Sequence, residues 1–169
     1  MNDQKKKNFG GWGAVLTSGN HQKEIYGGGM NTSNQKMELK ACIEALKAVK
    51  KKNMPTIVYS DSQYVVKGIE EWIYGWIQRK WHKVKNKELW QELKMLRDSF
   101  ESIKFVHVKG HSGVPGNERA DELARYGEKK TKENMENKMW EDMQNDSEKD
   151  LMSFCTSATM KNHQEFSQL

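Results

Sequence analysis

A change of periodicity within residues 56–72 constrains the fold more than any other feature of this chain. Residues 56–59 (TIVY) form an unbroken run of β-branched and aromatic side chains, which is typical of a buried strand. From Gln63 to Trp72 the apolar residues recur at helical spacing instead. Asp61 therefore lies where a strand ends and a helix begins, and open α/β sheets bind ligands at such points. The alternative is that Asp61 only caps the helix.

The residues before this stretch predict a β-hairpin and a helix. Residues 12–16 and 21–26 have the pattern of two strands joined by a short turn, and residues 27–29 (GGG) are predicted to end the second strand. The sequence TSNQ then fits a capping box with Thr32 as the N-cap. We expect the helix that follows to run to about residue 52, with Cys42 as a core thiol on its apolar side.

The residues after this stretch predict a helix, a strand and a further helix. Leucines at helical spacing mark residues 89–100, and residues 103–108 have the pattern of a strand. A glycine-rich loop leads into the last helix, which is predicted to be capped near Gly116 or Asn117. Gly127 suits the position just after the end of that helix.

The charge and the apolar pattern change together near residue 127. Residues 1–127 hold 22 Lys and Arg against 14 Asp and Glu (net +8), while residues 128–169 hold 6 against 9 (net −3). The basic part is the patterned part, which indicates a polyanionic partner or simple solubility. We therefore expect a polar basic segment over residues 1–9, one domain over residues 10–127, and a polar tail over residues 128–169 that is disordered or loosely helical.

No stretch of the sequence predicts a membrane segment or an export signal. No apolar run approaches the ~20 residues that a membrane span needs. The first residues, MNDQKKK, contain no hydrophobic core of a secretory signal. We expect a cytoplasmic monomer that makes no membrane contact.

Three acids share a placement near the ends of these predicted elements. Glu38 lies near the start of the first helix, Asp61 at a strand end and Asp121 one turn into the last helix. Structural explanations exist for each, namely a favourable helix dipole for Glu38, a cap for Asp61 and a pair with Arg125 for Asp121. Carboxylates gathered at one end of a sheet would repel unless a hard cation such as Mg²⁺ binds there. Two such ions can activate water and stabilise the leaving oxygen in phosphodiester cleavage.

A basic segment lies between the second predicted helix and the third. Its cations occur without an intervening acid, and tryptophans lie among them. Such a segment suits phosphate contact combined with stacking on sugars or bases. The alternative is a solvated face whose tryptophans belong to the core. The residues concerned are Trp76, Arg79, Lys80, Trp81, Lys83, Lys85 and Lys87.

Four segments, in this order, resemble those of type 1 ribonucleases H, either the cellular enzymes or homologous viral domains. They are residues 10–14 (GGWGA), 33–39 (SNQKMEL), 60–65 (SDSQYV) and 108–124 (VKGHSGVPGNERADELA). The resemblance spans about residues 10–127. It implies a ribonuclease H-like α/β fold with a mixed central sheet flanked by helices. It also implies hydrolysis of the RNA strand of RNA/DNA hybrids.

The same resemblance implies roles for the acids and for one histidine. Glu38 and Asp61 match positions that hold one metal ion, and Asp121 matches a position that holds another. His111 matches a residue on a mobile loop that helps to move protons and release product. The implied ions are Mg²⁺, or Mn²⁺ in its place, with two expected when substrate is bound.

Further positions resemble residues that bind substrate. Asn34, Gln35 and Gln63 match positions that contact the hybrid in its minor groove, where the RNA 2′-hydroxyls are accessible. Asn117 matches a residue near the scissile phosphate. The basic segment resembles a protrusion that grips the DNA strand. The residues that the resemblance assigns to DNA binding are Trp72, Trp76, Arg79, Lys80, Trp81, Lys83, Lys85 and Lys87.

The sequence departs from the family pattern at its start. Members of the family begin with a strand in the middle of the sheet, which ends in an Asp-Gly-Ser-like motif whose Asp bridges both metals. No such strand precedes Gly10, and Asp3 is followed by glutamine and three lysines. Three explanations are open: Met1 is internal to the loop after a missing first strand, the chain is a degenerate copy, or a β-prone tail piece at residues 151–158 fills the gap.

The predicted function is metal-dependent endonucleolytic hydrolysis of the RNA strand of RNA/DNA hybrids. The alternative is a catalytically impaired module that binds hybrids, because the bridging Asp is absent. A polynucleotidyl transferase of the same superfamily fits less well, because residues 61–63 (DSQ) and 109–111 (KGH) match ribonuclease H instead.

Overall fold

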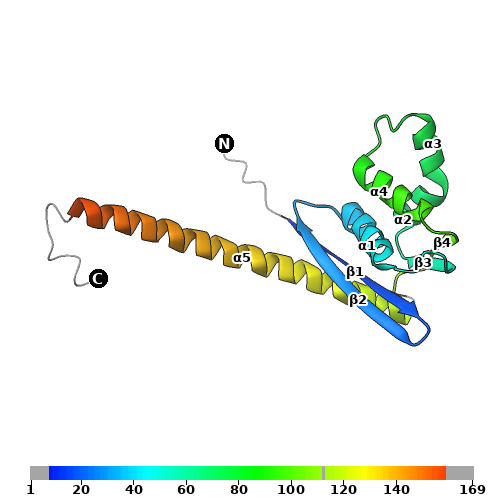
Figure 1. The fold of residues 1–169 in the computed structure, drawn as a ribbon, viewed down its shortest axis with the longest axis horizontal. Helices are drawn as coiled ribbons and strands as arrows, with labels where there is room; N and C mark the ends of the chain where they lie inside the picture. Colours follow the sequence, from blue (N-terminus) through cyan, green and yellow to red (C-terminus); the bar gives the residue numbers. More distant parts are fainter. Residues whose placement is uncertain (1–7, 112, 159–169) are drawn as a thin grey trace. The chain divides into compact units, whose positions relative to one another are not determined.

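The computed structural model describes residues 8–111 and 113–158, with side chains to residue 145 (Figure 1). The chain divides into two compact units, Met1–Thr131 and Lys132–Leu169. The expected site residues all belong to the first unit. Asp3 lies outside the described residues.

The first two strands form an antiparallel hairpin. Strand β1 (Phe9–Ser18) pairs with β2 (His21–Met30) in a continuous register. The predicted end of the second strand at residues 27–29 is therefore wrong. The strand continues through Gly27, where the Trp12 ring lies so close that a side chain would collide with the indole. The glycines here make room for neighbours and do not mark a turn.

Helix α1 (Asn34–Ala48) begins one residue later than the capping box predicted. Its N-cap is Ser33 and not Thr32, and the Ser33 hydroxyl accepts a 3.2 Å hydrogen bond from the Lys36 N–H. The helix also ends four residues before the predicted residue 52. Val49 is extended (φ −76°, ψ 120°), which stops the helical hydrogen bonding. Figure 1 shows α1 lying along the hairpin.

The second pair of strands is parallel and is connected through helices. Strand β3 (Thr56–Ser60) pairs with β4 (Ile103–His107). The helix predicted from Gln63 to Trp72 is confirmed as a helical run, but a π-helical turn follows its first five residues and the run continues to Gln78. The connecting elements are α2 (Gln63–Lys67), the π-helix η1 (Gly68–Trp72), α3 (Ile73–Gln78) and α4 (Lys87–Asp98).

The four strands form one antiparallel and one parallel pair. Within the described ranges, β1 pairs only with β2 and β3 only with β4, so the mixed strand directions are present without one continuous sheet. Residues 151–158 are helical, so the idea that they supply an extra strand is wrong. Ile57 and Tyr59 on β3 are 51% and 61% exposed, although parallel strands are usually covered on both faces.

The core is built mainly by the helices around β3 and β4. Leu39, Ile43 and Leu46 of α1 are fully buried, and they share one apolar cluster with Trp90 and Leu93 of α4. Cys42 is buried in the same cluster, which confirms its predicted place in the core. The cluster fixes α1 beside α4 and so determines where Glu38 lies.

Helix α5 (Pro115–Ala158) does not end at Gly127 as predicted. A Cβ on Gly127 would lie 2.1 Å from the Gly27 carbonyl oxygen, and a Cβ on Gly11 would lie 1.8 Å from the carbonyl oxygen of Ala124. Neither place can hold a side chain, since both obstacles are backbone. Gly127 is therefore needed for the close approach of α5 to β2, and it does not cap the helix.

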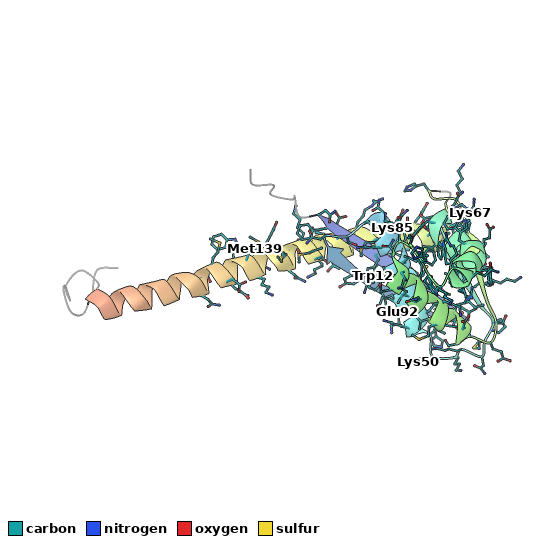
Figure 2. All side chains as sticks on the ribbon, turned by 90° about the horizontal axis from the view of Figure 1, so that it is seen from above. Trp12, Lys50, Lys67, Lys85, Glu92 and Met139 are labelled. Atoms are coloured by element: carbon teal, nitrogen blue, oxygen red, sulfur yellow. The ribbon has the colours of Figure 1, made fainter. Side chains whose placement is uncertain are left out.

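The second unit contains the rest of α5 up to Ala158. Its large apolar side chains Met139, Trp140 and Met143 are exposed, and Figure 2 labels Met139 on this part of the helix. Across residues 8–111 and 113–158, no helix has both the length and the apolar content that crossing a membrane requires.

Candidate active site

Asp61 follows the last residue of β3 and precedes the cap of α2. The cap is Ser62, whose hydroxyl accepts a 3.2 Å hydrogen bond from the Val65 N–H. The explanation of Asp61 as the helix cap is therefore wrong. Its carboxylate lies beside Gly110, where a Cβ would be 3.5 Å from Asp61 Oδ2. Asp61 is exposed, so its carboxylate is available to a ligand.

Glu38 contacts Ser62, the residue that follows Asp61 in the chain. The Ser62 hydroxyl donates a 2.6 Å hydrogen bond to Glu38 Oε2, and Ser62 itself is only 5% exposed. One buried hydroxyl thus caps α2 and orients an acid of α1. The explanation of Glu38 as a helix-dipole acid does not account for this contact, because Glu38 lies beyond the first turn of α1.

The Cys42 thiol lies one helical turn after Glu38 and responds to both acids. Burial raises the pKa of the Cys42 thiol to about 12, and the charges of Glu38 and Asp61 contribute to the same rise. Both carboxylates are therefore close enough to act electrostatically on one buried sulfur atom. This places Glu38 and Asp61 on the same side of the core.

Asp121 lies in the second turn of α5, opposite the glycine-rich loop. Its Oδ2 atom is 3.9 Å from His111 Nδ1. The expected partner Arg125 does not form this contact, because the loop brings His111 to Asp121 instead. His111 has a left-handed backbone (φ 55°), which costs roughly 1–2 kcal/mol for a residue with a Cβ. Such conformations are concentrated at functional sites.

An ion pair holds the start of α5 on the hairpin. The Arg119 guanidinium donates to Glu24 of β2 and, at 2.8 Å, to Glu122. Arg119 lies two residues before Asp121, so this contact restrains the turn that carries the acid. The sequence did not identify Glu24, because its partner is 95 residues away.

The three acids lie in two groups, one of which includes His111. Glu38 and Asp61 are joined through Ser62, and Asp121 faces His111. Gly110 links the groups, because it packs beside Asp61 and precedes His111. In the part of the chain that the structure describes, no group of three or more His, Cys, Asp or Glu side chains is close enough to hold a metal ion. The three-ligand arrangement therefore stays a prediction, although carboxylate and hydroxyl oxygens suit a hard divalent cation.

The amide side chains expected to bind substrate lie at the starts of three helices. Asn34 and Gln35 are the first two residues of α1, and Gln63 is the first residue of α2. Asn117 lies in the first turn of α5. The same three helices, or the residues just before them, carry Glu38, Asp61 and Asp121. Amides and acids therefore come from the same elements, and their roles toward substrate stay predictions.

The tryptophans expected to bind substrate form a connected aromatic cluster. Ring centroids are 6.2 Å apart for Trp72 and Trp76, and also for Trp76 and Trp81. Trp76 and Trp81 are half-buried against the core, whereas Trp72 is 42% exposed. The core explanation thus applies in part to Trp76 and Trp81, and the exposed ring of Trp72 is the member of this group most available for stacking.

Tyr64 joins this cluster from α2, which the sequence analysis missed. Its ring lies 5.2 Å from that of Trp90 and 6.3 Å from that of Trp72. Its hydroxyl accepts 3.1 Å hydrogen bonds from Trp90 Nε1 and from Asn86 Nδ2. A regular α-helix would not bring Tyr64 and Trp72 together, and no residue of the sequence marks the irregular turn that does.

The five cations of the basic segment are all exposed. The loop that carries them turns through several left-handed residues, with φ of 53° at Lys80, 61° at Trp81, 56° at Lys83 and 57° at Asn86. Residues with a Cβ adopt this conformation only where the surrounding structure imposes it. The loop therefore presents its cations from a defined backbone on the side of the aromatic cluster.

Comparison with known proteins identifies one family. A family model described as RNase H matches residues 2–129. A Ribonuclease H of Polaromonas naphthalenivorans is 55% identical over 124 residues, which cover 70% of this chain and 76% of that protein. A Ribonuclease H of Hahella chejuensis is 50% identical over 131 residues, which cover 75% of this chain and 87% of that protein.

Two solved structures share the fold. The crystal structure of LC9-RNase H1, a type 1 RNase H with the type 2 active-site motif, has a TM-score of 0.59 at 23% identity and covers 72% of this chain and 71% of that chain. The protease-reverse transcriptase of prototype foamy virus has a TM-score of 0.58 at 21% identity and covers 74% of this chain and 21% of that chain. Both confirm the expected α/β fold class.

Proposed function

This chain belongs to the ribonuclease H family and is an endoribonuclease of the kind that acts on RNA/DNA hybrids, and we propose that it cuts the RNA strand with two divalent metal ions. The observation that carries this proposal is the contact between Ser62 and Glu38. Because Ser62 caps α2, Asp61 is free of that role and its carboxylate stands exposed, and its charge acts together with that of Glu38 on the Cys42 thiol.

The family generally uses divalent metal ions, and we propose Mg²⁺, with Mn²⁺ as a substitute. Glu38 and Asp61 would hold one ion and Asp121 the other. The oxygen donors of these side chains fit such a cation. Bound there, such ions would supply activation of a water and stabilisation of charge on the leaving oxygen.

The protein's own groups supply proton transfer and orientation. The His111 imidazole is exposed, and its Nδ1 atom lies 3.9 Å from Asp121 Oδ2. We assign it the transfer of protons and help with product release. The Ser62 hydroxyl keeps Glu38 oriented during turnover, because it is buried and bonded on both sides.

Substrate would be gripped on both strands. Asn34, Gln35 and Gln63 would contact the RNA minor groove, where 2′-hydroxyls distinguish RNA from DNA. Asn117 would lie near the scissile phosphate. The DNA strand would run over the exposed cations of the basic segment, with Trp72 stacking on it. We also propose that the protein acts as a cytoplasmic monomer.

The alternative function is hybrid binding without cleavage. One observation favours it: among the described residues, no group of three or more acidic, histidine or cysteine side chains is close enough to hold a metal ion. Metal binding by Glu38 and Asp61 alone would be weaker than with a third carboxylate.

One assay separates the two functions. A hybrid with a labelled RNA strand is incubated with the full chain in Mg²⁺ and in EDTA, and binding of the same hybrid is measured in parallel. We expect RNA cleavage in Mg²⁺ and none in EDTA. Retained binding with no cleavage at high enzyme concentration would instead establish the binding module. Size-exclusion chromatography of the same sample checks the monomer.

A further inference from the structure

The helical run between β3 and the basic loop is interrupted by one π turn. In an α-helix the Ile73 N–H would donate to the Ile69 carbonyl, four residues back. Here it donates to the Gly68 carbonyl, five residues back. The Ile69 carbonyl thus loses its regular donor, although Ile69 is fully buried. A buried carbonyl in this position needs another partner.

Arg97 of α4 supplies that partner. Its Nη1 atom donates a 2.7 Å hydrogen bond to the Ile69 carbonyl across 28 residues of sequence. The side chain of Arg97 is only 15% exposed and also reaches Asp98 at 3.3 Å. Its guanidinium lies 6.0 Å from the centre of the Tyr74 ring. Arg97 is thus held in place on both sides of its bond to the π turn.

The π turn determines which way Trp72 points. Trp72 comes eight residues after Tyr64, so an uninterrupted α-helix would set the two roughly 80° apart around its axis. The wider π turn removes most of that offset. The two rings accordingly lie 6.3 Å apart in a T-shaped contact. A Cβ on Gly68 would lie 2.0 Å from the Trp90 ring, so Trp90 packs directly on the same turn.

We propose that Arg97 is a positioning residue for substrate binding. By bonding to the Ile69 carbonyl it holds the π turn, and the turn presents the exposed Trp72 ring beside Tyr64 and Trp76 as a stacking surface for nucleotides. Arg97 itself does not touch the substrate. Without the guanidinium, the Ile69 carbonyl regains its usual donor when the turn reverts to α-helical bonding, and that reversal rotates Trp72 away from Tyr64. The role in substrate binding rests on the proposed function, whereas the role in the turn does not.

The test compares Arg97→Met with the wild-type full chain. Near-UV circular dichroism of the free protein reports the coupled tryptophan and tyrosine rings, and steady-state cleavage of a hybrid separates KM from kcat. We expect a changed near-UV spectrum and a KM raised several-fold, with kcat within twofold of wild type. Arg97→Lys keeps a donor and should restore part of both. Asp98→Asn removes the charge beside Arg97 but keeps a side-chain oxygen that can accept from the guanidinium, so it should stay close to wild type in both.

Each result has a definite meaning. An unchanged near-UV spectrum in folded Arg97→Met would overturn the role of Arg97 in the turn. A changed spectrum with an unchanged KM would overturn its role in substrate binding. If the wild type binds hybrid without cutting it, the proposed function fails, and the Kd for the hybrid replaces KM in the same comparison. If Arg97→Met does not fold, Arg97→Gln takes its place, because its side chain is too short to reach Ile69.

Discussion

The Ser62 hydroxyl donates a 2.6 Å hydrogen bond to the Glu38 carboxylate, and so ties the start of α2 to the second turn of α1. The same hydroxyl accepts from the Val65 N–H as the cap of α2. Ser62 is buried, so neither bond is exchanged readily with water. Removing the Ser62 hydroxyl would therefore affect both the stability of α2 and the orientation of Glu38.

Ser62→Ala separates these two effects when it is compared with Ser33→Ala. Both variants lose an N-cap, so each should lower the free energy of unfolding by about 1 kcal/mol, measured by urea denaturation. Only Ser62→Ala should also lower kcat for hybrid cleavage, because only Ser62 touches Glu38. Equal kcat in the two variants would show that the Ser62–Glu38 bond does not matter for turnover.

Asp61→Asn should abolish cleavage while hybrid binding survives. The substitution removes a negative charge that we assign to metal binding and leaves the basic segment unchanged. Cleavage and binding of one labelled hybrid are measured on the same preparation. Asp98→Asn is the matched control, since it makes the same change on the exposed side of α4 and should retain wild-type cleavage. Near wild-type cleavage by Asp61→Asn would remove Asp61 from the metal site.

Gly127→Ala should destabilise the first unit even though alanine favours helices. The new Cβ would lie 2.1 Å from the Gly27 carbonyl oxygen, and neither backbone can yield. We expect a loss of about 2 kcal/mol in the free energy of unfolding. Gly75→Ala in α3 meets open space and should gain up to about 1 kcal/mol. Opposite signs for the two variants in thermal denaturation would establish the close contact of α5 with β2.

Cys42 should resist thiol reagents at pH 8 until the protein unfolds. Burial raises the pKa of its thiol to about 12 from an ordinary 9.0, so the reactive thiolate is scarce in the folded state. A Cys155→Ser background leaves Cys42 as the single reacting thiol. The reaction is followed with Ellman's reagent in EDTA, with and without urea. Rapid reaction in the native protein would show that the thiol is accessible.

The same shift predicts how stability depends on pH. The protonated thiol is favoured in the folded state, so its contribution is complete below pH 9 and is lost as the pH rises from 9 to 12. The loss is up to about 1.4 kcal/mol per pH unit. The free energy of unfolding should therefore decline less steeply from pH 9 to 12 in Cys42→Ala than in the protein that retains Cys42, as measured by urea denaturation.

Lys85→Ala should weaken hybrid binding in a salt-dependent way. If Lys85 contacts a phosphate, its loss reduces the slope of log Kd against log salt by about 1. Lys50→Ala is the control, because Lys50 is also exposed but lies just after α1 and outside the basic segment. Both residues are labelled in Figure 2. An unchanged slope for Lys85→Ala would exclude this lysine from the interface.

Local sequence patterns predicted the presence and order of the strands and helices better than their ends. The run TIVY predicted β3, and the placement of Asp61 after it followed from the change in period. The helix boundaries were less accurate at Ser33 and Ala48, because a cap depends on backbone geometry that neighbouring serines and threonines can adopt equally well. Gly127 misled for a related reason, since its lack of a side chain serves packing and not a turn.

The sequence by itself determined the family and the order of the elements, because these depend on local pattern and on recurring motifs. Only the tertiary structure decided that Ser62, and not Asp61, caps α2, and that Arg97 bonds to the π turn beside Trp72. Those contacts join residues far apart in the chain, and a hydrogen bond of this kind forms only after the core has brought α1, α2 and α4 together. No local pattern encodes such a partner, and so the folded chain alone reveals it.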